Sequence, residues 1–256
     1  MTDSGSALEE ALRNFGSGLD DAERHNWQLM LSAMIGEFGR KHGPKGPTAD
    51  AERATWRSLV KAAASLYPGG ARAATTPRFV TDLLPELASE AENLESGAER
   101  LGPSEFLGSG PTAARMSRDP RLTAGISREV GADVGPVRSC HYFYYNREGD
   151  HLLPHIDSAS SSGVIFLLAL RHVPPVDGGP GSALVVHTPQ GEAKRFPLRA
   201  GESVLLLGAG TVHEREPLGP GEKITLLSIG HAFGPHPPEP LWREPLKKGN
   251  NVHPDQ

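Results

Sequence analysis

The sequence has 256 residues, a formal net charge of −5 and a hydrophobic content of 37%, with 30 glycines and 23 prolines. This mild acidity, without any dense Lys/Arg block, argues against nucleic acid or an anionic membrane as the main partner. The polar, acidic start is not a signal peptide, the apolar runs are too short to cross a bilayer, and one cysteine, Cys140, permits no internal disulfide, so we expect a cytoplasmic protein.

The first half of the chain has the pattern of amphipathic helices, with apolar residues at helical spacing between start and stop signals. Pro85 lies inside one such pattern and is expected to break or restart that helix, because proline removes a backbone hydrogen bond. We therefore expect residues 1–135 to form a helical layer that packs on the rest of the chain. Its helices are expected to begin near Ser6, Asp21, Thr48, Thr76 and Asp119.

After Gly131 the sequence changes to short β-branched and aromatic segments separated by glycine- and proline-rich turns. This succession predicts a barrel or sandwich built on two sheets over residues 136–233. The proline-rich residues 234–256 are expected to form a coil tail. Eight strands are expected, at residues 137–146, 150–157, 163–171, 182–188, 193–198, 203–207, 211–215 and 222–230.

His155 and Asp157 lie two residues apart on one expected strand, just after the aromatic stretch HYFYYN. Residues i and i+2 of a strand point to the same face, so both side chains can enter the barrel together. A buried carboxylate is costly without a partner, and a divalent metal ion supplies one. Two histidines and one carboxylate make the facial triad of non-haem Fe(II) enzymes, so a further histidine on another strand is expected.

The segment from His213 to Lys223 resembles the distal motif of the Fe(II)/2-oxoglutarate-dependent oxygenases, in their prolyl 4-hydroxylase-like branch. That motif has a histidine, then a proline, a glycine and a basic residue four, eight and ten positions later. The earlier part of the family pattern also matches, although one extra residue separates Tyr145 from the following glycine. The resemblance covers roughly residues 137–233. The matching residues are Tyr145, Gly149, His155, Asp157, Gly178, Gly179, His213, Pro217, Gly221 and Lys223.

The resemblance implies a double-stranded β-helix, a jelly-roll or cupin-like core in a mainly β protein with an α-helical N-terminal layer. It implies that His155, Asp157 and His213 bind Fe(II), and that the protein uses 2-oxoglutarate and O₂. The expected reaction is hydroxylation of an unactivated C–H bond of a small molecule, an amino acid or natural-product intermediate, with release of succinate and CO₂. Desaturation and cyclisation are other outcomes. The alternatives are a cupin-like barrel that binds a small molecule without chemistry, a peptidyl or protein hydroxylase, and an interaction module in the helical half.

The resemblance also implies a cation for the co-substrate, because the C5 carboxylate of 2-oxoglutarate would be buried. Lys223 is the first choice, since its position relative to His213 is that of the family, and Thr225 lies on the same face of its strand as a possible hydroxyl donor. Arg215 is the second choice. It shares a strand face with His213 if the strand is regular, and an arginine can bind a carboxylate with two hydrogen bonds. Tyr145 is a further candidate contact of the co-substrate.

Overall fold

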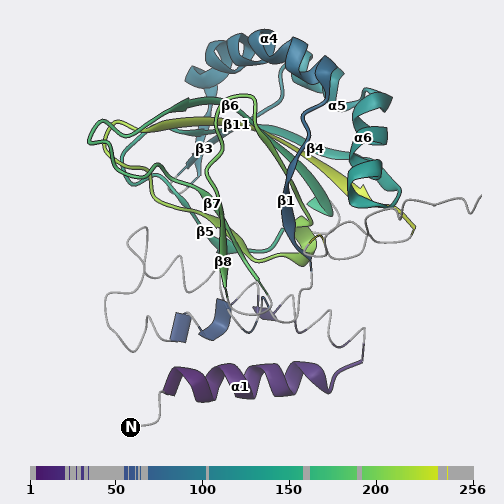
Figure 1. The fold of residues 1–256 in the computed structure, drawn as a ribbon, viewed down its shortest axis with the longest axis vertical. Helices are drawn as coiled ribbons and strands as arrows, with labels where there is room; N and C mark the ends of the chain where they lie inside the picture. The colour runs from purple at the N-terminus through teal and green to yellow at the C-terminus, as the bar shows by residue number, and fades with distance from the viewer. Residues whose placement is uncertain are drawn as a thin grey trace, which may run out of the picture.

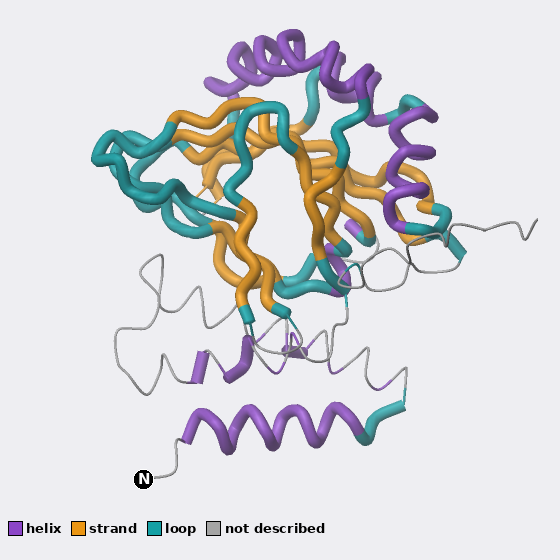
Figure 2. Tube along the Cα trace, in the orientation of Figure 1, coloured by secondary structure: helices purple, strands orange, loops and turns teal. Residues whose placement is uncertain are grey.

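The computed structural model describes residues 4–20, 69–101, 104–157, 162–188, 192–235 and 241, and scattered positions between 23 and 64. Two antiparallel sheets face each other, and helices cover the outer face of the larger one (Figure 1). Figure 2 shows the strands at the centre, with helices on the outside. Among the described residues, no helix has the length and apolar character needed to cross a membrane.

The larger sheet has seven strands and the smaller sheet has four, and all pairs are antiparallel. Each of the eight strands predicted from the sequence is present, as β4 to β11. The order across the larger sheet is β1 (Ala71–Ala74), β9 (Ser203–Leu206), β6 (Val164–Val173), β11 (Lys223–Phe233), β4 (Val134–Tyr145), β3 (Ser104–Gly108) and β2 (Glu99–Leu101); the smaller sheet runs β5 (Leu152–His155), β10 (His213–Arg215), β7 (Leu184–His187) and β8 (Ala193–Phe196).

Three strands, β1 to β3, lie in the segment that was expected to be helical. The expectation of a helical layer over residues 1–135 did not include these strands, which join the larger sheet alongside the helices of this region. These strands have three to five residues each, too few for a clear alternating pattern. β1 pairs with β9 and β3 pairs with β4, so the neighbouring strands impose the extended conformation.

The helices of the outer layer are α4 (Arg78–Leu94), α5 (Pro111–Ser117) and α6 (Pro120–Val130). Pro85 does not break α4, contrary to expectation. Val80, Leu87 and Ala91 on either side of it are buried against the sheet, and this packing offsets the cost of about 3 kcal/mol that an interior proline imposes.

The predicted limits of α6 are confirmed. The Asp119 side chain accepts a hydrogen bond from the Arg121 backbone N–H at 2.9 Å, which caps the first turn, and Pro120 occupies the first helical position. Gly131 ends the helix at φ 73°, a left-handed conformation that favours glycine.

A further helix is α1 (Ser4–Ser17), and two short 3-10 turns lie at Glu95–Gly97 and Gly208–Gly210. The helices expected from Asp21 and Thr48 fall mostly outside the described residues, as does most of the tail 234–256. α1 lies below the smaller sheet in the view of Figure 1, on the side opposite α4.

Side-chain alternation along β4 and β11 separates two apolar cores. Tyr142 and Tyr144 of β4, and Leu227 of β11, point toward the helices and pack with them. Tyr145 of β4 and Leu226 of β11 point between the two sheets, where the second core lies. One face of β4 and β11 therefore packs on the helices, and the opposite face lines the space between the two sheets.

Candidate metal and co-substrate site

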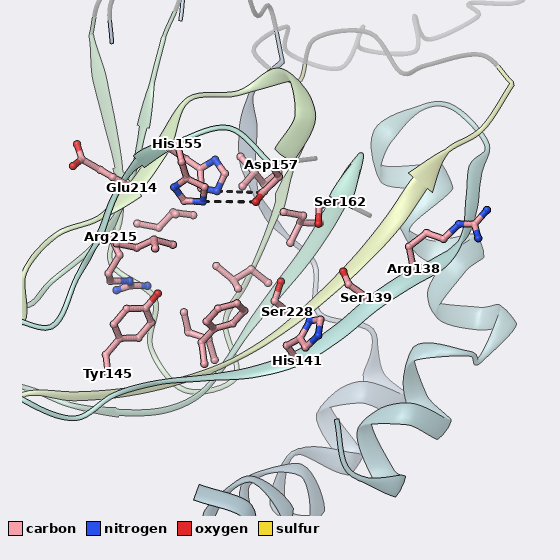
Figure 3. A pocket seen from close by; sticks show the side chains of 18 residues that line it. Arg138, Ser139, His141, Tyr145, His155, Asp157, Ser162, Glu214, Arg215 and Ser228 are labelled. Atoms are coloured by element: carbon pink, nitrogen blue, oxygen red, sulfur yellow. Dashed lines mark ion pairs between the residues drawn. The ribbon is translucent and has the colours of Figure 1, made fainter. Parts of the chain in front are cut away.

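His155, Asp157 and His213 come together at one point between the two sheets. Figure 3 shows His155 and Asp157 there, in the wall of a pocket. His155 ends β5 and His213 begins β10, and the two are direct partners in the antiparallel pairing of these strands. Asp157 follows β5 by two residues. One ligand atom from each residue lies within 4.8 Å of the others, and these three form the cluster of metal-ligand type found among the described residues.

Backbone hydrogen bonds orient both imidazole rings. Nδ1 of His155 lies 2.8 Å from the carbonyl oxygen of Leu153, and Nδ1 of His213 lies 3.0 Å from that of Thr211. A carbonyl oxygen only accepts, so Nδ1 carries the proton in each ring and the Nε2 lone pair remains available. This is the arrangement that holds metal-binding histidines in place in proteins.

The carboxylate of Asp157 faces both Nε2 atoms. The two ion-pair distances are 3.6 Å from His155 and 3.3 Å from His213. The Asp157 backbone N–H donates to the carbonyl of Gly208 at 3.1 Å, which fixes the position of the residue. A Cβ atom at Gly208 would lie 2.7 Å from Oδ2 of Asp157, so only glycine leaves room for the carboxylate here.

The three groups shift one another's protonation. Burial, together with the charge of His213, lowers the pKa of His155 to about 4. Burial also acts on the other two groups, raising the pKa of Asp157 and lowering that of His213. Their mutual attraction outweighs burial, so the pKa of His213 is raised and the pKa of Asp157 is lowered. Oδ2 of Asp157 is buried without a well-formed hydrogen bond from any described residue. Two neutral imidazole nitrogens and one such carboxylate fit the requirements of a divalent metal ion.

The triad forms part of the wall of a cavity of about 320 Å³ between the sheets. This volume lies at the small end of the range for small-molecule sites. Most of the wall is apolar and comes from inward-facing residues of β4, β6, β9 and β11. The cavity therefore combines an apolar surface with the metal-binding point and a few other polar side chains.

Arg215 enters this cavity from β10, two residues after His213 (Figure 3). Its side chain is buried. Nη1 donates to the carbonyl of Ser182 at 3.2 Å, Nη2 is buried without a partner, and the guanidinium lies 5.7 Å from the centre of the Tyr145 ring. Burial lowers the pKa of Arg215 against the opposing influence of Tyr145 and nearby acidic groups. No described carboxylate lies within ion-pair distance, so the guanidinium is a buried cation that lacks an anion.

Lys223 and Thr225, the first-choice cation and its neighbouring hydroxyl, are not among the residues that line the cavity. On β11, Leu226 and Ser228 line the cavity, and residues at odd positions face the opposite side of the sheet. Lys223 is exposed, and Thr225 is buried on the side of the helices, opposite Tyr144 in the pairing with β4. The structure brings Arg215 and Tyr145 to the triad, and it does not bring Lys223 or Thr225.

A second polar group in the cavity wall was not anticipated from the sequence. It consists of Arg138, Ser139 and His141 of β4 with Ser228 of β11, and it lies on the other side of the triad from Arg215 (Figure 3). The alternation of β4 could have indicated two of these residues, because positions 139, 141, 143 and 145 share a strand face. Arg138 has the opposite parity, and no sequence signal indicated it.

The fold is that of the Fe(II)/2-oxoglutarate oxygenases, the superfamily that the sequence motifs resemble. The similar solved structures include the non-heme alpha-ketoglutarate-dependent epimerase SnoN from nogalamycin biosynthesis, at a TM-score of 0.54 and 18% identity over 74% of this chain and 89% of that one. SnoN in complex with Fe³⁺, alpha-ketoglutarate and nogalamycin RO gives a TM-score of 0.53 and 17% identity over 74% and 90% of the two chains.

A prolyl hydroxylase from Trichoplax adhaerens, in complex with a peptide fragment of the hypoxia inducible factor oxygen degradation domain, gives a TM-score of 0.51. It is 14% identical over 64% of this chain and 84% of that one. No family model matches the sequence, and no curated protein matches it. These neighbours share the fold that the resemblance in the motifs implies.

Proposed function

We propose that the protein is an Fe(II)- and 2-oxoglutarate-dependent dioxygenase that hydroxylates an unactivated C–H bond of a small molecule and releases succinate and CO₂. The observation that carries this proposal is the pair His213 and Arg215. One strand presents a metal-ligand histidine and an unpaired buried cation to the same cavity. A metal and a carboxylate-bearing co-substrate satisfy both groups at once.

In this proposal His155, Asp157 and His213 hold Fe(II) through Nε2, a carboxylate oxygen and Nε2. The bound iron, with 2-oxoglutarate and O₂, supplies the oxidising chemistry. The protein's own contribution is to position these groups. The Leu153 and Thr211 carbonyls hold the two rings, and with only three protein ligands a bound iron would keep positions for the co-substrate and oxygen.

Arg215 binds the C5 carboxylate of 2-oxoglutarate. Successive strand residues are about 3.4 Å apart, so Arg215 lies about 7 Å along β10 from His213, within reach of a five-carbon diacid. Ser182 accepts from one guanidinium nitrogen, and the other is buried without a partner among the described residues. Burial raises the pKa of Tyr145 to about 12, so its hydroxyl stays protonated and can donate a hydrogen bond to the same carboxylate.

A small molecule is favoured over a peptide by the volume and apolar lining of the cavity. An amino acid or a natural-product intermediate has this size. The solved neighbours include both an epimerase crystallised with nogalamycin RO and a prolyl hydroxylase crystallised with a peptide, so a peptidyl hydroxylase is the second candidate. A cytoplasmic location and the absence of a nucleic-acid partner remain predictions from composition.

The test is a substrate screen that follows succinate release from protein loaded with Fe(II) and 2-oxoglutarate. Small molecules and proline-containing peptides are screened side by side, and the product is identified by mass, because succinate alone does not separate hydroxylation from desaturation or epimerisation. His155→Ala is the inactive control. Failure of the wild-type protein to bind 2-oxoglutarate in the presence of metal would indicate a cupin-like binding barrel instead.

A further inference from the structure

We propose that the cavity has a second binding subsite, formed by Arg138, Ser139 and Ser228, which binds the carboxylate of an amphipathic small-molecule substrate. This inference rests on the proposed function, because it assigns the Arg215 end of the cavity to 2-oxoglutarate. It names the class of substrate: a molecule with an apolar body, presented to the metal, and a carboxylate at its far end.

The two ends of the cavity lie on opposite sides of the triad. Tyr145 and Arg215 are together at one end, and Ser139, His141 and Ser228 are at the other (Figure 3). The strand register agrees with this view, because Ser228 is the direct partner of His141 across β4 and β11. Ser139 lies six positions before Tyr145 on β4, which corresponds to about 20 Å along the strand. The wall therefore has room for a second molecule beside 2-oxoglutarate.

A β-bulge places Arg138 at the rim of the cavity. Regular alternation from Tyr145, Phe143, His141 and Ser139 would place residue 138 on the side of the helices. The register with β11 instead skips it: Gly230 is opposite Ser139, and His231 is opposite Val137. Arg138 is thus the extra residue of β4, and it lines the cavity next to Ser139. Bulges commonly redirect a side chain in this way beside active sites.

The charges at this end favour an anion. Arg138 is exposed at the rim, and no described residue forms an ion pair with it. The acidic residues in the cavity wall are Asp157, which belongs to the triad, and Glu214, whose carboxylate is held by His187 at 2.8 Å. Hydroxyl groups of serine can donate to the same carboxylate.

The space and the apolar surface between the two ends fit the rest of such a substrate. β11 presents Gly230 opposite Ser139, so no side chain from that strand covers the serine. Phe143, Ile165 and Leu206 are among the apolar residues that line the same cavity. Figure 3 shows Arg138 farthest from the triad, with its guanidinium directed away from it. A substrate acid group bound there stays near solvent, and the apolar body extends toward the metal.

Matched acids and amides test the subsite directly. The probes are 4-phenylbutanoate with 4-phenylbutanamide, and hexanoate with hexanamide. Binding is measured by calorimetry on the full chain with Mn(II) in place of iron and with saturating 2-oxoglutarate, so that Arg215 is already occupied. Because Arg138 is partly solvated, each acid is expected to bind about fivefold more tightly than its amide.

Variants assign that preference to Arg138. Arg138→Gln should remove the preference and leave amide binding within about twofold, while Arg138→Lys, which keeps the charge, should retain most of it. Arg78→Gln is the matched control, since Arg78 is an exposed arginine at the start of α4, outside the cavity lining. The proposal is overturned if acids and amides are not distinguished by the wild-type protein, or if the preference survives in Arg138→Gln.

A further titration separates this proposal from the proposed function. The same probes are added to Arg215→Met without 2-oxoglutarate. A preference that persists there and disappears in the double variant with Arg138→Gln supports the subsite even if the wild-type protein fails to bind 2-oxoglutarate. A preference that depends on Arg215 alone would show that the acids had occupied the co-substrate end, and would refute the subsite.

Discussion

His213 and Arg215 lie two residues apart on β10, and both side chains enter the same cavity. The strand thereby fixes the distance between a metal ligand and a buried guanidinium. Ser182 satisfies one nitrogen of that guanidinium, and the other has no partner among the described residues. A buried charge that lacks a partner is costly, and a bound carboxylate removes the cost. The affinity for 2-oxoglutarate should therefore depend on this residue.

Arg215→Met should weaken 2-oxoglutarate binding by more than a hundredfold, since loss of one partner of a buried ion pair costs about 3–5 kcal/mol. Lys223→Ala is the matched control: it removes an exposed cation outside the cavity and should change the affinity less than twofold. Calorimetry with Mn(II) in place of iron measures both. If Lys223→Ala is the damaging variant, the family register identifies the anchor correctly and the cavity geometry does not.

The metal site predicts a spectroscopic result. Anaerobic addition of Fe(II) and 2-oxoglutarate to the wild-type protein should produce the visible charge-transfer band of a chelated keto acid. His155→Ala and His213→Ala should abolish it, because each removes an Nε2 that faces the metal position. His187→Ala should leave the band intact, since Nε2 of His187 is bound to Glu214 and the ring is outside the cavity lining. A band of full intensity in either ligand variant would exclude that histidine as a ligand.

Asp157→Gly should stop turnover while the fold survives. Its ion pairs are with the two histidines and it belongs to no apolar core, so its removal strips one negative charge from the metal position and leaves the apolar cores in place. Iron binding should weaken, and the melting temperatures of the two metal-free proteins should agree within about 4 °C, which corresponds to about 1–2 kcal/mol in a protein of this size. Wild-type turnover in the variant would show that Asp157 is not a ligand.

The strands of the core could be predicted from the sequence, because β-branched and aromatic segments alternate with glycine and proline turns throughout residues 136–233. The ligand triad could be proposed for a related reason. His155 and Asp157 are close along the chain, and the residues that follow His213 match a motif of fixed spacing. Such local patterns can be recognised in the sequence without knowing which strands pair.

The features that depend on how the strands pair could not be predicted from the sequence. Whether Lys223 faces the cavity is decided by the parity of β11, and a shift of one residue sends every side chain to the other face. Arg138 reaches the cavity only through a bulge whose position depends on pairing with β11. β1, with the sequence ARAA, has no strand pattern of its own and is extended because it pairs with β9.

The last prediction concerns Glu90 of α4, which ties the helical layer to the sheet. Its carboxylate accepts hydrogen bonds from the Tyr142 hydroxyl at 2.6 Å and from the backbone N–H groups of Thr112 and Ala113, at 2.6 and 3.0 Å, in the first turn of α5. Burial opposes ionisation, but these hydrogen bonds prevail and lower the pKa of Glu90. The ionised form is therefore the one that stabilises the fold.

Glu90→Gln should lower the free energy of unfolding at pH 7 by about 1–3 kcal/mol, the usual worth of hydrogen bonds to a charged group. Because the pKa of Glu90 is lower in the folded state than its ordinary value of 4.5, the stabilisation is complete above that value and is lost as the pH falls through the folded pKa. Urea unfolding at pH 7 and at several lower pH values should show that the difference in the free energy of unfolding between wild type and variant becomes smaller toward acid.

Glu92→Gln is the control, because Glu92 is an exposed neighbour on the same helix, and this variant should change the free energy of unfolding little at any pH. A gap that stays constant from pH 7 down to the acid limit of the fold would mean that the Glu90 side chain stabilises the structure through packing and not through its charge.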